Sequence, residues 1–128
     1  MNGAQRLQAT CLSTVFFECG KDGKFHEKEL PLQAQFSPVY AIAALDYNRD
    51  GKGDLLLCGN ENKARMRFGK SDANYGVLLQ GDGAGNFQYI PQPASGFHLR
   101  GDVRSILSLN NTLLFGINGE AVRAYRMP

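Results

Sequence analysis

Oxygen-bearing side chains recur at alternate positions in the segment LDYNRDGKGDLLLCGN, residues 45–60. Asp46, Asn48 and Asp50 occupy every second position, and Asp54 completes the pattern D-x-N-x-D-G-x-x-D. Carboxylates placed this close together repel one another unless a positive charge lies between them. The chemistry that this spacing predicts is therefore the binding of a cation.

A loop of this composition can curl around an ion. Gly51 permits a sharp bend after the third oxygen donor, and the main-chain carbonyl of Lys52 then points inward. Ca²⁺ takes about six to eight oxygen ligands, whereas Mg²⁺ prefers fewer protein ligands and more water. The predicted Ca²⁺ ligands are Asp46, Asn48, Asp50, Lys52 through its carbonyl, and Asp54. The alternative is a turn without an ion, because Asp, Asn and Gly favour turns in any case.

The flanks of this loop distinguish it from an EF-hand. Position 12 of an EF-hand loop is a glutamate, but that position is Leu57 here. The flanking segments AIAAL and LLLCG are typical of strands rather than helices. We therefore expect a loop between two strands, in which an ion would stiffen the hairpin without taking part in catalysis.

The elements that position this loop occur twice in the chain. TVFFECGKDGKFHEKELP aligns with GVLLQGDGAGNFQYIPQP, VYAIAALDYN with VRSILSLNNT, and LLLCGN with LLFGIN. The offsets between the aligned segments are 62, 64 and 58 residues, respectively. The last offset is shorter because the second copy lacks the acidic loop. The chain thus contains two tandem repeats, at about 13–60 and 76–127, joined by a connecting loop at 61–75.

Each repeat predicts four short strands joined by glycine-rich turns. Asp-Gly and Asn-Gly steps favour the positive φ angles of hairpin turns, and no segment keeps a helical period. The predicted strands are 13–19, 24–30, 38–45 and 54–59, then 76–81, 86–90, 102–109 and 112–117, with a short run at 121–126. The sequence therefore predicts an all-β fold of two four-stranded antiparallel blades of the β-propeller type.

Two blades cannot close a ring, since propellers need about four to eight blades. The remaining blades would come from a longer chain or from other copies of this one. Bare strand edges invite pairing with other chains, and a domain this short has a small core. Both points predict self-association.

Composition excludes several classes of protein. The 128 residues carry a net charge of +2 and are 43% hydrophobic, which indicates a globular chain without a basic nucleic-acid-binding face. No apolar run approaches the roughly 20 residues that span a bilayer, and the first residues do not resemble a signal peptide. Cys11, Cys19 and Cys58 form no CxxC pair, so the sequence predicts neither a zinc site nor a disulfide framework.

The sequence does not predict an enzyme. His26 and His98 lie in different repeats, and neither adjoins the GxSxG turn of a hydrolase. The G-x-G step within GDGAGNF lies between two predicted strands rather than before a helix, which argues against a phosphate site. The RGD tripeptide at 100–102 is too short to indicate adhesion, and its position at a strand start favours a structural role.

The longest polar connection, NENKARMRFGKSDANYG at residues 60–76, is a candidate binding surface. Binding residues collect on loops that a rigid scaffold positions. The candidate residues, for an acidic or sugar-like ligand, are Arg65, Arg67, Lys70, Asp72 and Tyr75. The alternative is a solvated loop without a ligand.

The segment DYNRDGKGDLLLCGN, followed by FGKSDANYGVLLQGDGAGNF, resembles the VCBS/FG-GAP repeat family, the propeller repeats of the integrin α-subunit type. The resemblance covers about Thr14 to Met127. The segments RFGKSDANYG and SGFHLRGDVRSI are similar to the C-terminal part of VCBS proteins related to the ASPIC/UnbV group. The resemblance implies calcium at the five loop positions and an extracellular or periplasmic location. No complete Gly-Ala-Pro follows Phe68 and Gly69, and family members usually have more repeats, so the chain looks truncated.

These patterns together predict a calcium-stabilised repeat module that binds or scaffolds proteins or glycans without catalysis. The expected partners are other copies of the chain, the remaining repeats of a parent protein, or an extracellular protein or glycan. The alternatives are an accessory part of an exported enzyme and a lectin-like oligomer.

Overall fold

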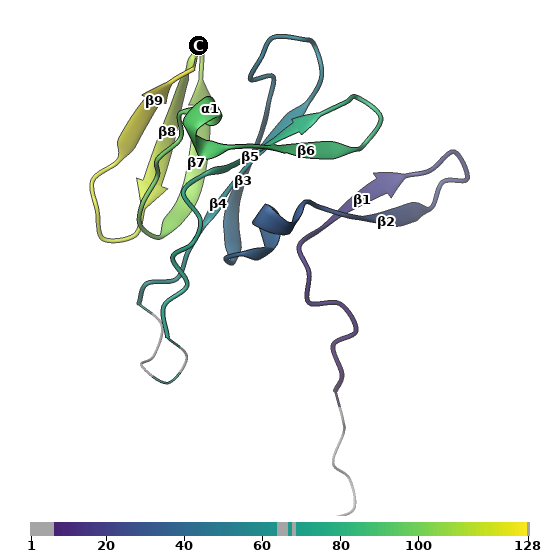
Figure 1. Ribbon diagram of the computed structural model, residues 1–128, viewed down its shortest axis with the longest axis horizontal. Helices are drawn as coiled ribbons and strands as arrows, with labels where there is room; N and C mark the ends of the chain where they lie inside the picture. Colours follow the sequence, from purple (N-terminus) through teal and green to yellow (C-terminus); the bar gives the residue numbers. More distant parts are fainter. Residues whose placement is uncertain (1–6, 64–66, 68, 128) are drawn as a thin grey trace, which may run out of the picture.

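The computed structural model describes residues 7–63, 67 and 69–127 (Figure 1). These residues form an all-β structure with two short helical turns, η1 (Leu32–Gln35) and α1 (Gln92–Ser95). The strands are β1 (Val15–Cys19), β2 (Phe25–Glu29), β3 (Val39–Leu45), β4 (Asp54–Gly59), β5 (Val77–Gly81), β6 (Phe87–Ile90), β7 (Val103–Leu109), β8 (Thr112–Ile117) and β9 (Arg123–Arg126). No helix within the described part of the chain is long and apolar enough to cross a membrane.

The strands form three antiparallel sheets, and this division differs from the predicted one. The predicted all-β, antiparallel character is confirmed, but the sheets are β1-β2, β3-β4-β5-β6 and β7-β8-β9 instead of two sheets of four strands. The difference arises because β5 pairs with β4, with Leu78 opposite Leu56 and both side chains buried. The first two strands of each sequence repeat therefore belong to one sheet, and its last two strands belong to the next sheet.

The internal repetition extends to the details of strand pairing. Strands β3 and β7 begin 64 residues apart, at Val39 and Val103, and each has seven residues. The pairing of β3 with β4 has a register shift between Val39 and Ala41, and the pairing of β7 with β8 has one between Val103 and Ser105. Matching bulges at matching positions indicate that both copies follow the same local backbone path.

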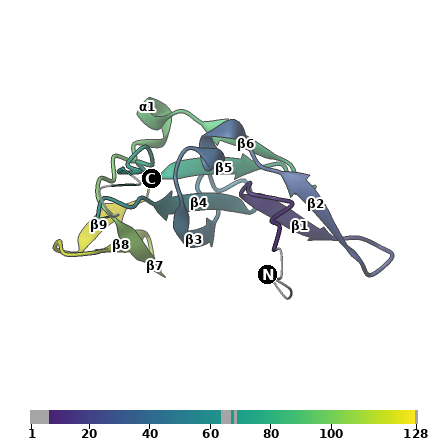
Figure 2. The ribbon, with the colours of Figure 1, turned by 90° about the horizontal axis from the view of Figure 1, so that it is seen from below.

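The three sheets lie in a row, with the four-stranded sheet in the middle (Figures 1 and 2). The strand β4 carries a continuous apolar run because both faces of its sheet are covered. Between the hairpin β1-β2 and the four-stranded sheet lies a core of Leu30, Ala34, Leu57, Val77 and Leu79. Between the four-stranded and three-stranded sheets lies a larger core of Ala41, Leu56, Cys58, Leu78, Phe97, Leu99, Val103, Leu113, Phe115 and Ile117.

Candidate functional site

The acidic loop connects β3 to β4 and exposes four of the five residues predicted as ligands, Asp46, Asn48, Asp50 and Lys52. The main-chain N–H of Asp50 donates to Asp46 Oδ1 at 3.0 Å and to Asn48 Oδ1 at 3.1 Å. The N–H of Gly51 donates to Asp46 Oδ2 at 2.9 Å. The oxygens of Asp46 and Asn48 therefore converge on the main-chain N–H of Asp50, and their role as calcium ligands stays a prediction.

The Asp50 carboxylate is held by its own neighbours in the loop. It accepts a hydrogen bond from Asn48 Nδ2 at 2.9 Å and another from the Lys52 N–H at 2.8 Å. These two hydrogen bonds, with that of Asn48 the larger effect, lower the pKa of Asp50 below its ordinary value. Gly51, with φ of 81°, adopts the left-handed conformation that the bend requires.

Asp54 occupies a different environment at the base of the loop. Its side chain is buried, with 1% of the residue exposed, whereas Asp46, Asn48, Asp50 and Lys52 are exposed. Asp54 Oδ2 accepts from the Tyr47 N–H at 2.9 Å, and Oδ1 accepts from the Gly81 N–H at 2.9 Å. The close approach needs glycine at position 81, since a Cβ there would collide with the Gly53 carbonyl oxygen. Asp54 thus ties the loop to β5.

The oxygen atoms of the loop match part of the set of ligands that a hard cation such as calcium binds. The exposed set has two carboxylates and one amide, and calcium accepts amide and main-chain carbonyl oxygens beside carboxylates. Among the described residues, however, no group of three or more His, Cys, Asp or Glu side chains is placed to hold a metal ion. A calcium site here would therefore depend on Asn48 and the Lys52 carbonyl as well as on the carboxylates.

Asp-Gly turns elsewhere in the chain use the carboxylate as a turn-forming acceptor. Asp82, between β5 and β6, accepts from the Ala84 N–H at 2.7 Å and from Asn86 Nδ2 at 2.6 Å. The hydrogen bonds from Asn86 and Ala84 lower the pKa of Asp82 to about 2. Asp22 accepts from the Lys24 N–H at 3.1 Å in the equivalent turn between β1 and β2. This chemistry is the ion-free alternative for the acidic loop.

The predicted binding loop, residues 60–76, is anchored by a buried asparagine. Asn60 Oδ1 accepts from Ser37 Oγ at 2.8 Å and from the Asn74 N–H at 2.9 Å. Asn60 Nδ2 donates to the carbonyl oxygens of Asn74 and Gly101, at 2.7 and 3.2 Å. The side chain thus clamps the two ends of the loop to each other and to the chain before β7.

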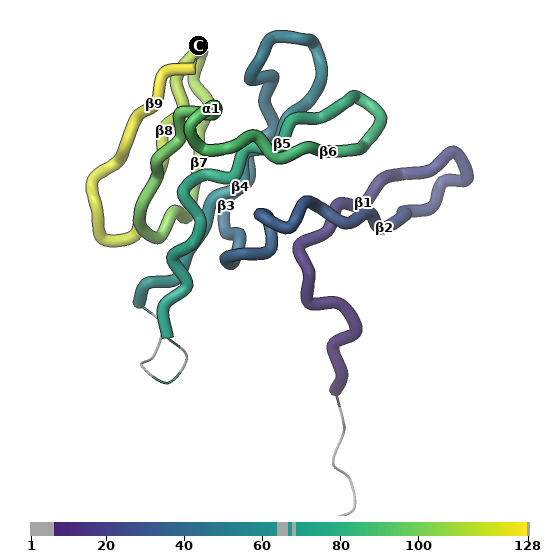
Figure 3. The backbone as a smooth tube through the Cα atoms, in the orientation of Figure 1, coloured from purple at the N-terminus to yellow at the C-terminus, as the bar shows by residue number. Residues whose placement is uncertain are grey.

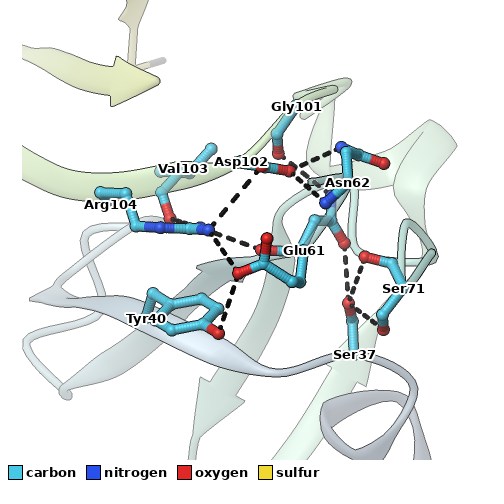
Figure 4. A network of polar contacts seen from close by, with 10 residues as sticks. Ser37, Tyr40, Glu61, Asn62, Ser71, Gly101, Asp102, Val103 and Arg104 are labelled. Atoms are coloured by element: carbon cyan, nitrogen blue, oxygen red, sulfur yellow. Dashed lines mark hydrogen bonds and ion pairs between the residues drawn. The ribbon is translucent and has the colours of Figure 1, made fainter. Parts of the chain in front are cut away.

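A charged network lies beside this anchor, between β3 and β7 (Figure 4). Arg104 donates to Glu61 Oε2 at 3.0 Å and stacks on the ring of Tyr40, with its guanidinium carbon 3.9 Å from the ring centroid. Asp102 Oδ1 accepts from Asn62 Nδ2 at 2.7 Å. Among the described residues, Asp102 Oδ2 is the one buried side-chain oxygen or nitrogen without a hydrogen bond. The Arg104 guanidinium, 3.8 Å away, balances its charge.

A polar hollow of about 280 Å³ opens next to this network. Tyr75 is its aromatic member, and its ring stacks on His98 with centroids 5.5 Å apart. The guanidinium carbon of Arg100 lies 5.8 Å from the centroid of the same ring. The hollow is lined by Asn62, Asp72, Tyr75, Arg100, Gly101 and Glu120.

The structure brings only part of the predicted binding loop to this hollow. Asp72 and Tyr75 line it, Arg67 and Lys70 are exposed and do not, and Arg65 lies outside the described residues. The sequence interpretation missed Arg100 and Glu120, which come from distant segments. The available signal is the RGD tripeptide, which contains Arg100 and lies at a predicted strand start.

The two histidines lie apart in the fold. His26 Nε2 is 3.2 Å from Asp22 Oδ1 on the hairpin β1-β2, and His98 Nδ1 is 2.7 Å from Gln92 Nε2 after α1.

Comparisons of the chain with models of protein families, with curated proteins and with solved structures found no match. The resemblance to VCBS/FG-GAP repeats accordingly stays a prediction.

Proposed function

We propose that this chain is a β-propeller-type repeat module of the VCBS/FG-GAP kind that binds or scaffolds proteins or glycans without catalysis. The observation that carries the proposal is the repetition of strand bounds, pairing register and bulge position between the two copies. Propellers are built by radial repetition of four-stranded antiparallel sheets, and the sheet β3-β4-β5-β6 has that form.

The arrangement of the sheets also supports this proposal. The first strands of two successive sheets, β3 and β7, contact one another, and β4 also contacts β7 (Figure 3). First strands that lie side by side are what a ring of blades places around its axis. The extracellular or periplasmic location is proposed on the resemblance alone.

Calcium is the proposed ligand of the acidic loop. Asp46, Asn48, Asp50 and the Lys52 carbonyl would hold it, while Asp54 anchors the loop through hydrogen bonds that already use both of its oxygens. Bound Ca²⁺ would supply the positive charge that offsets the repulsion between Asp46 and Asp50. An ion that binds only the ordered loop stabilises the folded state.

The hollow beside Tyr75 is the proposed ligand-binding surface. Ligand sites combine aromatic side chains with a few convergent polar groups, and this one combines Tyr75 with Asp72, Arg100 and Glu120. Groups of both charges beside an aromatic ring suit the hydroxyl groups of a glycan, which both donate and accept hydrogen bonds.

A thermal melt with and without calcium tests the calcium part of the proposal. The melting temperature should be higher in CaCl₂ than in EGTA, and Asp50→Asn should remove this difference because it removes one ligand charge. Asp82→Asn is the matched control, since it changes the same residue type in a turn outside the loop. If calcium leaves the wild-type melt unchanged, the loop is an ion-free turn and the calcium part of the proposal is wrong.

A further inference from the structure

The chain contains the same sheet-to-sheet interface twice. In the first interface, the four-stranded sheet presents Leu57, Leu79 and Phe87 to the hairpin β1-β2. The rings of Phe16 and Phe87 meet edge to face there, with centroids 5.2 Å apart. In the second interface, the three-stranded sheet presents Phe115 and Tyr125 to the four-stranded sheet.

The pairing registers show that these are equivalent faces. Leu57 pairs with Val77 in the four-stranded sheet. Phe115 lies 58 residues after Leu57 and pairs with Arg123 in the three-stranded sheet. Leu79 and Tyr125 are likewise equivalent, opposite Leu55 and Leu113. Each sheet therefore packs one defined face, which we call the front face, against the back face of the sheet before it.

The hairpin at one end of the row leaves its front face open. Offset by 62 residues, Phe17 is the equivalent of Leu79 and Phe25 is the equivalent of Phe87. Phe17 is 55% exposed and Phe25 is 72% exposed, although Leu79 is fully buried in the four-stranded sheet. The hairpin thus presents two aromatic side chains at positions that the fold elsewhere covers.

The three-stranded sheet at the other end leaves its back face open. The four-stranded sheet uses Ala43, Leu45, Leu56 and Leu78 on its back face. The equivalent residues by register are Leu107, Leu109, Leu114 and Ala124. Leu107 and Leu109 are 58% and 57% exposed. The hairpin therefore leaves bare the part of the front face that β5 and β6 form in the four-stranded sheet, and the three-stranded sheet leaves its back face bare.

We propose that the front face of the hairpin in one copy of this chain packs against the back face of the three-stranded sheet in a second copy. The inference rests on the proposed function, because both depend on the repetition of the sheets. A second copy is the expected partner because the chain already packs these two kinds of face against each other within one copy. Such a contact joins different surfaces of the two copies, so it is heterologous and forms a ring if the rotation closes.

Light scattering and sedimentation of the full chain test the proposal, over a roughly hundredfold range of concentration because association follows mass action. The wild type should have a mass above that of the monomer. Phe25→Asp and Leu107→Asp should each weaken association by about tenfold or more, because each places a charge in the centre of an apolar contact. Leu32→Asp is the matched control, since Leu32 is 67% exposed on η1 and belongs to neither face.

Mixing the two variants distinguishes this contact from other modes of association. The Phe25→Asp copy keeps an intact back face, and the Leu107→Asp copy keeps an intact front face. Together they should form a dimer of twice the monomer mass that grows no further. A monomeric wild type, or a mixture that stays monomeric beside an associating wild type, would overturn the proposal. Calcium-dependent melting is measured separately, so either result leaves the test of the proposed function standing. Leu109→Asp serves as a second back-face variant if Leu107→Asp does not fold.

Discussion

Asp54 and Gly81 are 27 residues apart in the sequence, yet the Asp54 Oδ1 accepts a hydrogen bond from the Gly81 N–H at 2.9 Å. The second oxygen of the same carboxylate accepts from the Tyr47 N–H. A single buried side chain therefore joins the start of the acidic loop to a strand of the sheet beneath it. Asp54 is therefore a buried link between the acidic loop and β5.

Asp54→Ala should lower the free energy of unfolding by about 2–4 kcal/mol, because it leaves two N–H groups without an acceptor in a buried site. Urea denaturation followed by circular dichroism measures this loss. Asp46→Ala is the matched control in the exposed part of the loop, and it should cost less. Equal losses for the two variants would mean that Asp54 has no special anchoring role.

Acid should destabilise the protein through its turn-forming aspartates. The pKa of Asp82 is lowered from 3.8 to about 2, so the folded state favours its charged form. A depressed pKa contributes stability above pH 3.8, and this contribution is lost as the pH falls towards about 2. Asp22 and Asp50 have pKa values shifted in the same direction.

The urea midpoint, followed from about pH 5 to about pH 2, should therefore fall less steeply in Asp82→Asn than in the wild type. Asp72→Asn removes the same charge from an exposed loop position and provides the control. If Asp82→Asn and the wild type follow parallel curves throughout this range, the hydrogen bonds at Asp82 do not contribute to acid stability.

Arg104 should be more important for stability than other arginines with carboxylate partners. Its removal in Arg104→Leu leaves the Asp102 carboxylate, which is 3% exposed, without a positive charge nearby. We expect a loss of about 1–3 kcal/mol, reduced from the cost of a fully buried pair because Arg104 is partly exposed. Arg123→Leu breaks the exposed pair with Glu120 and should cost about 0–1 kcal/mol.

A double variant separates the charge from the packing of Arg104. Asp102→Asn removes the unbalanced charge and retains the oxygen that accepts from Asn62, so it should recover part of the loss in the Arg104→Leu background. Urea denaturation of the four combinations gives the coupling energy. Additive effects of the two substitutions would show that Arg104 acts through its other contacts, with Tyr40, Glu61 and the Asn60 carbonyl oxygen.

The sequence predicted the strands and turns well because the signals for them are local. The strands β3 and β7 lie within the predicted strands 38–45 and 102–109, and Gly51 adopts the positive φ that the turn demands. Asp46, Asn48 and Asp50 lie close together because they are neighbours along the loop, while their role as calcium ligands stays a prediction.

The partition into sheets depends on contacts between distant segments, which local patterns do not specify. Nothing near Leu57 in the sequence indicates that its partner on one side is Val77, beyond the long polar connection. The role of Asp54 is equally hard to predict from the local sequence, because it depends on a hydrogen bond with Gly81. The hollow also combines Tyr75 with Arg100 and Glu120, whose proximity follows from the packing of the three-stranded sheet against the four-stranded sheet.

The hollow beside Tyr75 should bind carbohydrate if the proposed function is correct. Screening the chain against a panel of immobilised oligosaccharides would identify a glycan, and Tyr75→Ala should then lower the affinity by about tenfold or more, because it removes the aromatic surface of the site. Arg100→Gln should also weaken binding, since it removes the one basic side chain of the lining.

Lys70→Gln is the control, because Lys70 is exposed on the same loop outside the hollow. Retained binding in both Tyr75→Ala and Arg100→Gln would place the glycan elsewhere, and the absence of any bound oligosaccharide would favour a protein partner.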